Sequence, residues 1–153
     1  MEKLAKDISQ IIITEVENIN DKVKGLNFLE LLKANILESL SELVNKQIFS
    51  FDNILNYENE IKQDSRNIKI SINYFINSLT ETKRTISNDS LFISFNENSN
   101  LDIYTNEKKF TSILLYKNTG ISLPKDTIIN SKYYKNLLLI EIINKEKEEI
   151  LTK

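Results

Sequence analysis

The spacing of apolar residues changes along this chain, and that change limits the folds it can adopt. Up to about residue 48 the apolar residues recur every three to four positions, the repeat of an amphipathic helix. After Asn88 the period becomes two, because Leu91, Ile93 and Phe95 alternate with polar residues. The 153 residues have the size of one domain. We therefore predict an α+β fold in a single domain, 1–153, with a helical part at 1–86 and a β-rich part at 87–153.

The helical part begins with two amphipathic segments. In residues 3–24 the apolar side chains fall within about a third of the helix circumference, and they are Leu4, Ile8, Ile11, Ile12, Val16, Ile19 and Val23. Gly25 follows where a left-handed residue ends a helix. Asn27 offers an N-cap to a second helix, with Glu30 as the partner in a capping box. This second helix is expected to run to about Ile48 and to be buried between two neighbours.

The segment 52–86 carries two competing patterns. One 3–4 repeat contains Ile54, Ile61, Ile68, Ile72, Phe75, Leu79 and Ile86. The rival pattern is the alternation typical of a strand, which contains Ile68, Ile70, Ile72, Tyr74 and Ile76. The longer pattern is harder to produce by accident, so we predict one long helix and keep the strand at 67–77 as the alternative.

The β-rich part divides into short strands separated by turn residues. Strands are expected at 91–95, 101–105, 110–116 and near 127–129, with Pro124 interrupting pairing before the last of these. The segment 137–143 is apolar on both faces apart from Glu141, which predicts a central strand with helices on one side. The expected architecture is an N-terminal three-helix hairpin or bundle packed on a C-terminal antiparallel β-meander of four to five strands.

Several chemistries lack their residues in this sequence. The chain has no His and no Cys, which excludes imidazole–thiolate zinc sites, Ser-His-Asp or Cys-His catalysis and thiol redox chemistry. Its two glycines, Gly25 and Gly120, are too few for a P-loop or a dinucleotide fingerprint. We therefore expect no cofactor, no metal site and no catalytic residue, and we predict that the protein is not an enzyme.

Charge and hydropathy restrict the partners. The net charge is −2, from 20 basic and 22 acidic residues, so we do not expect binding to the nucleic-acid backbone. The longest apolar runs, 11–13 and 137–140, are far shorter than the roughly 20 residues of a membrane helix. The N-terminus lacks the apolar stretch of a signal peptide. A cytoplasmic protein without a membrane contact is expected. The abundance of Ile, Asn and Lys is typical of an AT-rich, bacterial-type genome.

Two alternatives follow from short motifs. A Mg²⁺-dependent, carboxylate-based nuclease or hydrolase would use an Asp with a Glu-x-Lys, and 60–62 and 81–83 match the short pattern, while Asp102 and Glu107 lie in the meander without the required spacing. The segment 132–135, Lys-Tyr-Tyr-Lys, interleaves aromatic and basic residues as a nucleic-acid-binding accessory protein does.

The leading interpretation is a non-catalytic protein–protein interaction module. Four apolar residues lie off the main stripes of their predicted helices and form a candidate partner-binding surface, namely Ile13, Leu31, Ile70 and Tyr74. The partner would be another protein, bound through a helix, or a second copy in a homodimer. An adaptor, a secretion or flagellar-type chaperone or co-chaperone, or an immunity-type inhibitor fits these features.

Overall fold

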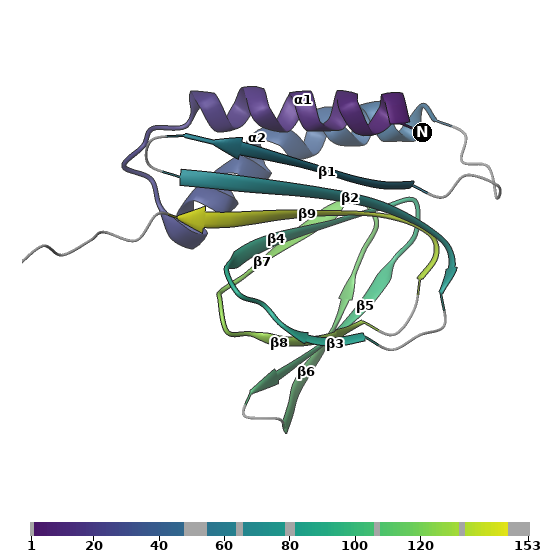
Figure 1. Ribbon diagram of the computed structural model, residues 1–153. Helices are drawn as coiled ribbons and strands as arrows, with labels where there is room; N and C mark the ends of the chain where they lie inside the picture. The colour runs from purple at the N-terminus through teal and green to yellow at the C-terminus, as the bar shows by residue number, and fades with distance from the viewer. Residues whose placement is uncertain are drawn as a thin grey trace, which may run out of the picture.

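The computed structural model describes residues 2–47, 55–63, 66–78, 82–105, 108–131 and 134–146 (Figure 1). Two helices come first in these residues, α1 (Glu2–Asn18) and α2 (Gly25–Asn45). Strands follow, and they are β1 (Leu55–Lys62), β2 (Arg66–Ser78), β3 (Thr82–Thr85), β4 (Asp89–Phe95), β5 (Ser99–Thr105), β6 (Lys108–Leu115), β7 (Thr119–Leu123), β8 (Ile128–Ser131) and β9 (Tyr134–Glu146).

The strands form two antiparallel sheets. The larger sheet has the order β1-β2-β9-β4-β7 and the smaller has the order β3-β8-β5-β6. Among the strands that the structure describes, only β1–β2 and β5–β6 pair with the next strand in the sequence, so the connectivity is not that of a meander. The C-terminal strand β9 lies between β2 and β4, as its apolar sequence indicates.

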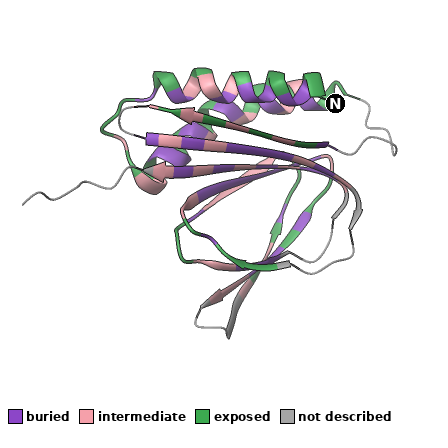
Figure 2. Cartoon of the chain, viewed as in Figure 1, coloured by how far each residue is buried: buried purple, intermediate pink, exposed green. Residues whose placement is uncertain are grey.

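Both helices lie against one face of the five-stranded sheet (Figure 1), with α1 over β1 and α2 over β4 and β7. Alternate residues of the central strands point toward the helices and are fully buried, and they include Ile68, Ile70, Ile72, Ile140, Ile142, Leu91 and Ile93. Figure 2 shows the same division on α1, which is buried toward the sheet and exposed on its outer side. This layer holds the larger of two apolar cores.

A second, smaller core lies between the two sheets. Phe92 of β4 and Leu123 of β7 meet Leu101 of β5, Leu115 of β6 and Ile129 of β8 there. The smaller sheet thus packs on the β4–β7 end of the larger one (Figure 1). The face of β1, β2 and β9 that points away from the helices lies outside this core.

The predicted three-helix bundle on a four- to five-stranded meander is wrong. Residues 55–62 and 66–78 form a β-hairpin, β1–β2, and residues 82–85 form β3. Ile61 and Ile68, one heptad apart in the predicted helix, are directly opposite each other in that hairpin. The residues of the 3–4 repeat thus belong to paired strands, and the alternative of a strand at 67–77 is the observed structure. Ile54 and Leu79 lie outside the described residues.

The boundary between the helices also differs from the prediction. The first helix ends at Asn18 rather than at residue 24, and Gly25, with φ of 61°, begins α2 instead of ending α1. Asn27 is inside α2 and does not cap it. The connecting loop is held by Arg66, whose Nη2 donates to the carbonyl oxygens of Asn20 and Val23 at 3.0 and 2.8 Å.

Candidate functional site

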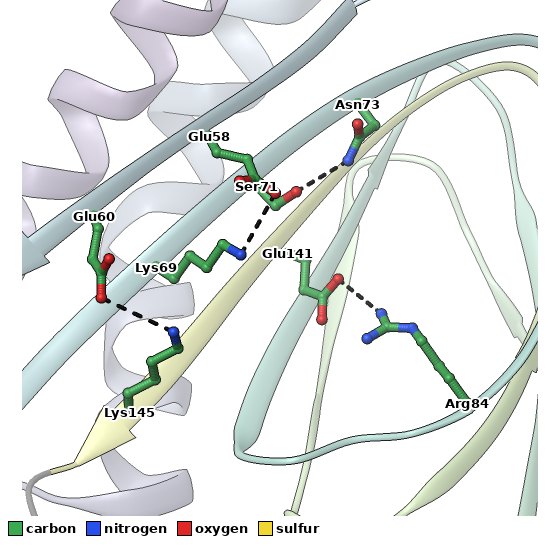
Figure 3. A network of polar contacts seen from close by, with 8 residues as sticks. All are labelled: Glu58, Glu60, Lys69, Ser71, Asn73, Arg84, Glu141 and Lys145. Carbon is green, nitrogen blue, oxygen red and sulfur yellow. Dashed lines mark hydrogen bonds and ion pairs between the residues drawn. The ribbon is translucent and has the colours of Figure 1, made fainter.

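A polar strip occupies the face of β1, β2 and β9 that points away from the helices (Figure 3). Because side chains alternate along a strand, the neighbours of the buried isoleucines point to this side. The strip consists of Glu58 and Glu60 from β1, Lys69, Ser71 and Asn73 from β2, and Glu141 and Lys145 from β9.

Arg84 of β3 reaches this strip from the smaller sheet. Its register partner in β8 is Ile129, a residue of the core between the sheets, so Arg84 also points toward the larger sheet. Its Nη2 donates to Oε2 of Glu141 at 2.8 Å, and its guanidinium carbon lies 5.7 Å from the ring centre of Phe92. Phe92 and Glu141 are themselves register partners in β4 and β9. The ion pair therefore stands where the apolar core between the sheets ends.

Two hollows adjoin each other along the strip. The first has a volume of about 300 Å³ and is lined on its charged sides by Lys69, Arg84, Glu141 and Lys145, with Ser90, Ile143 and the segment 85–88 completing the wall. We call this hollow the polar cleft. The second, of about 280 Å³, is lined by Glu58, Asn59, Glu60, Lys69 and Lys145. Lys69 and Lys145 line both hollows. The second hollow adds the carboxylates of Glu58 and Glu60, whereas the polar cleft adds Arg84 as a third cation.

The lysines of the cleft have carboxylate partners on the edge strand. Nζ of Lys69 lies 3.5 Å from Oε1 of Glu58, and Nζ of Lys145 lies 4.0 Å from Oε1 of Glu60. All four side chains are between 32% and 58% exposed. Exposed ion pairs of this kind contribute about 0.2–1 kcal/mol. Both lysines are therefore available to a ligand at little cost.

The carboxylate of Glu141 is the most buried charged group that lines the cleft among those whose ion pairs are described, with a side chain 14% exposed. Its Oε2 accepts from Arg84, whereas its Oε1 is buried and accepts no hydrogen bond from the described residues. A buried carboxylate oxygen without a donor is uncommon in folded proteins and costs free energy. The described residues therefore leave Oε1 of Glu141 without a hydrogen-bond donor.

The described residues hold no cluster of three or more metal-ligating side chains. Among the same residues, neither helix combines the length and the apolar character that a membrane crossing requires. The chemistry that the strip offers is ionic recognition and hydrogen bonding by Lys, Arg, Ser and Glu.

The four residues predicted to bind a partner are not brought together. Ile70 and Tyr74 belong to β2 and are buried beneath the helices, at 0% and 2% exposure. Ile13 of α1 is partly buried and packs against the same core. Leu31 of α2 is the exposed member, at 40%. Partner binding through Ile13 and Leu31 stays a prediction.

The described residues of the nuclease motif do not come together in the structure. Glu60 joins the strip through Lys145, while Lys62 is an exposed residue at the end of β1. Asp102 is buried in β5, where its Oδ1 accepts from Ser112. Residues 81, 107, 132 and 133 lie outside the described residues. The described members of the nuclease motif therefore lie on different sheets.

Sequence reasoning missed the residues of the cleft. Lys69, Arg84 and Lys145 carry no motif and are three of 20 basic residues. Glu141 did have a signal, because it is the charged residue in the otherwise apolar segment 137–143. A charge in a central strand needs a partner or a ligand, so Glu141 could have been singled out from the sequence, but not the residues that surround it.

No protein-family model and no curated protein sequence matches this chain. Solved structures do match. A cupin superfamily protein from Desulfitobacterium hafniense aligns with a TM-score of 0.48 and 13% identity, over 68% of this chain and 85% of its own. A protein from Bacillus halodurans aligns with a TM-score of 0.48 and 11% identity, over 77% of this chain and 83% of its own.

Hydroxypropylphosphonic acid epoxidase from S. wedmorenis aligns with a TM-score of 0.42 and 10% identity, over 63% of this chain and 58% of its own. At TM-scores below 0.5 and identities of at most 13%, these three likenesses assign neither a family nor an activity to this chain.

The prediction of a non-catalytic adaptor, chaperone or immunity-type inhibitor is wrong. It rested on surplus apolar positions of three long helices, and the residues expected to form the third helix form the strands β1, β2 and β3 instead. The prediction that the protein is not an enzyme is contradicted as well, since an epoxidase is among the solved structures that match, although this likeness assigns no activity to this chain.

Proposed function

We propose that this protein binds a small anionic solute in the polar cleft. The observation that carries the proposal is the convergence of three cations, Lys69, Arg84 and Lys145, on one hollow of about 300 Å³ that has Glu141 as its acidic residue. The three cations come from three different strands, β2, β3 and β9. Such convergence of charge in a concave site is typical of ligand recognition.

The ion pairs of the two lysines do not neutralise their charge firmly. Glu58 and Glu60 stand on the edge strand β1 and share the lysines with solvent. An anion inside the cleft lies among several cations at once, at distances where each pair is worth a few kcal/mol at an effective dielectric constant near 20. Entry of an anion therefore replaces weak pairs by stronger ones.

The size of the cleft favours a small solute. A volume of about 300 Å³ is at the lower end of known ligand sites. The net charge of −2 also opposes a polyanion such as nucleic acid, which needs an extended basic surface. A phosphate monoester or a short carboxylate matches both the volume and the charge.

The test is an NMR titration of the ¹⁵N-labelled protein with three probes: inorganic phosphate, succinate and glycerol 3-phosphate, with glycerol as the neutral control. We expect saturable shifts at the amides of Lys69, Glu141 and Lys145, with a dissociation constant of about 1 mM or tighter for at least one anion. Glycerol is expected to cause none.

Two substitutions identify the site. Lys69→Gln and Arg84→Gln are expected to weaken anion binding about tenfold each, because each removes one of the converging charges. Lys83→Gln is the matched control, since Lys83 is an exposed cation next to Arg84 whose ammonium lies over the Tyr104 ring at 4.7 Å. Equal losses for Lys83→Gln and Arg84→Gln, or no shifts with any anion, would contradict the proposal.

A further inference from the structure

The charges that line the two adjoining hollows are equal in number but separated in space (Figure 3). Three cations and three carboxylates line the two hollows taken together. All three cations line the polar cleft, where Glu141 is the one carboxylate, whereas Glu58 and Glu60 line the second hollow. The cleft alone thus has an excess of positive charge, and the two hollows together have none. The arrangement as a whole is a dipole.

A solute with negative charge alone matches only half of this dipole. Inside the cleft it is held by Lys69 and Lys145. The ammonium groups of these lysines already pair with Glu58 and Glu60, at 3.5 and 4.0 Å. An anion that draws on the lysines therefore leaves the two carboxylates less compensated, and it adds its own negative charge beside them. A cationic group on the same solute removes this repulsion.

We propose that the solute carries an ammonium group as well as its anionic group, with the anionic group in the polar cleft and the ammonium group at Glu58 and Glu60. The inference rests on the proposed function and names its ligand class, the aminoalkyl phosphates and short amino acids. Such a solute places opposite charges at the two ends of the dipole, so its electrostatic complementarity extends over both hollows.

Glu58 and Glu60 are accessible to an ammonium group. Their side chains are 58% and 42% exposed, and β1 is an edge strand of the larger sheet. The two residues are two positions apart in β1, so their side chains point to the same side of the sheet. An ammonium group has three N–H donors, and two neighbouring carboxylates are suitable acceptors for them.

The strand registers set the length of the solute. Glu58 is opposite Ser71 of β2, and Ser71 is opposite Glu141 of β9. Adjacent strands lie about 4.8 Å apart, so the carboxylates of β1 stand one strand spacing from Lys69 and two from Glu141. A chain of two or three carbons between the ammonium and the anionic group spans one such spacing. 2-Aminoethyl phosphate is a probe of this length.

The decisive experiment compares 2-aminoethyl phosphate with ethyl phosphate by calorimetric titration at pH 8. Both phosphate groups are dianionic there, because their second pKa is about 6, and the two probes differ in the ammonium group. Ethyl phosphate has the larger net negative charge, so a site for anions alone would bind it at least as tightly as the other probe. We expect the reverse order, with 2-aminoethyl phosphate bound about tenfold more tightly.

The possible results separate this inference from the proposed function. Equal affinity for the two probes, or tighter binding of ethyl phosphate, would overturn the requirement for an ammonium group and leave anion binding intact. Absence of binding by both probes would overturn the proposed function itself.

Two variants assign the preference to β1. Glu58→Gln and Glu60→Gln each remove one negative charge near the ammonium group and release one lysine. We expect 2-aminoethyl phosphate to bind each variant about three- to tenfold more weakly, and ethyl phosphate to bind at least as tightly as it binds the native protein. A general loss of structure would weaken both probes instead. Glu38→Gln, at an exposed position of α2, is the control and should change neither affinity. An unchanged preference in both β1 variants would contradict the inference.

Discussion

The two faces of the five-stranded sheet have opposite characters although they are built from the same strands. Toward the helices, the central strands present fully buried isoleucine and leucine side chains, such as Ile70 and Ile140. Toward the other side, the adjacent residues are Lys69 and Glu141. This second face has a buried apolar core where the smaller sheet covers it, as at Phe92. The helices thus cover the apolar face of the sheet. The smaller sheet covers the opposite face only in part, and the polar cleft lies beside the covered part.

The largest expected difference comes from placing glutamine on each face of β2 in turn. Ile70→Gln buries an amide at a position with 0% exposure and is expected to lower the free energy of unfolding by about 3–5 kcal/mol. Lys69→Gln, one position earlier on the opposite face, should change it by less than about 1 kcal/mol. Urea denaturation followed by circular dichroism measures both values. Similar losses for the two variants would mean that both faces of β2 are core.

A charged residue on the apolar face sharpens the comparison. Arg66 is 2% exposed and shares that face with Ile68, yet it donates to two loop carbonyls and lies 4.0 Å from the ring centre of Phe28. Arg66→Met keeps the apolar contact and removes the donors, so we expect a loss of about 2–4 kcal/mol in the free energy of unfolding.

The conservative variant separates charge from geometry at this position. Arg66→Lys keeps the positive charge but replaces the planar fork by a compact ammonium group. We expect its stability to lie between those of the native protein and Arg66→Met in thermal melts. A stability of Arg66→Met equal to the native value would show that the loop does not depend on this side chain.

The fold was predictable where one pattern had no competitor. In residues 2–18 the helical stripe of Ile8, Ile12 and Val16 is clear, and all three are fully buried. The strands at 91–95 and 137–143 were likewise located, within β4 and β9. In β2 two patterns overlapped. The β-branched residues Ile68, Ile70 and Ile72 favour a strand, and pairing with β1 on one side and the distant β9 on the other decides it.

The order of the strands was not predictable from local patterns. Strand β4 pairs with β7 and β9, which are distant in sequence, and a meander assumes sequential neighbours. The candidate site depends on the same long-range pairing, because Glu58, Ser71 and Glu141 become neighbours only through the registers of β1, β2 and β9. Residue types alone therefore could not reveal the polar cleft.

The smallest expected effect lies at the rim of the helix-facing side, where charges remain in solvent. Glu30 of α2 pairs with Lys33 at 2.8 Å, and Nζ of Lys33 lies 3.5 Å from the carbonyl oxygen of Gly120 in β7. The hydrogen bond from Lys33 holds the pKa of Glu30 below its usual value of 4.5. Because the folded state favours the ionised carboxylate, this stabilisation is present above about pH 4.5 and is lost as the pH falls through the lowered pKa.

The variant Glu30→Gln measures this contribution. The side chain of Glu30 is 52% exposed, so solvent screens the pair, and the variant should lower the free energy of unfolding by less than about 1 kcal/mol at pH 7. At about pH 3 the difference between the native protein and the variant should shrink, because the native carboxylate is then being protonated. Glu38→Gln, at an exposed position of the same helix, corrects for the replacement of a helical glutamate. A difference that grows toward acidic pH would reverse the sign of the linkage and show that the carboxyl group of Glu30 is favoured in its neutral form.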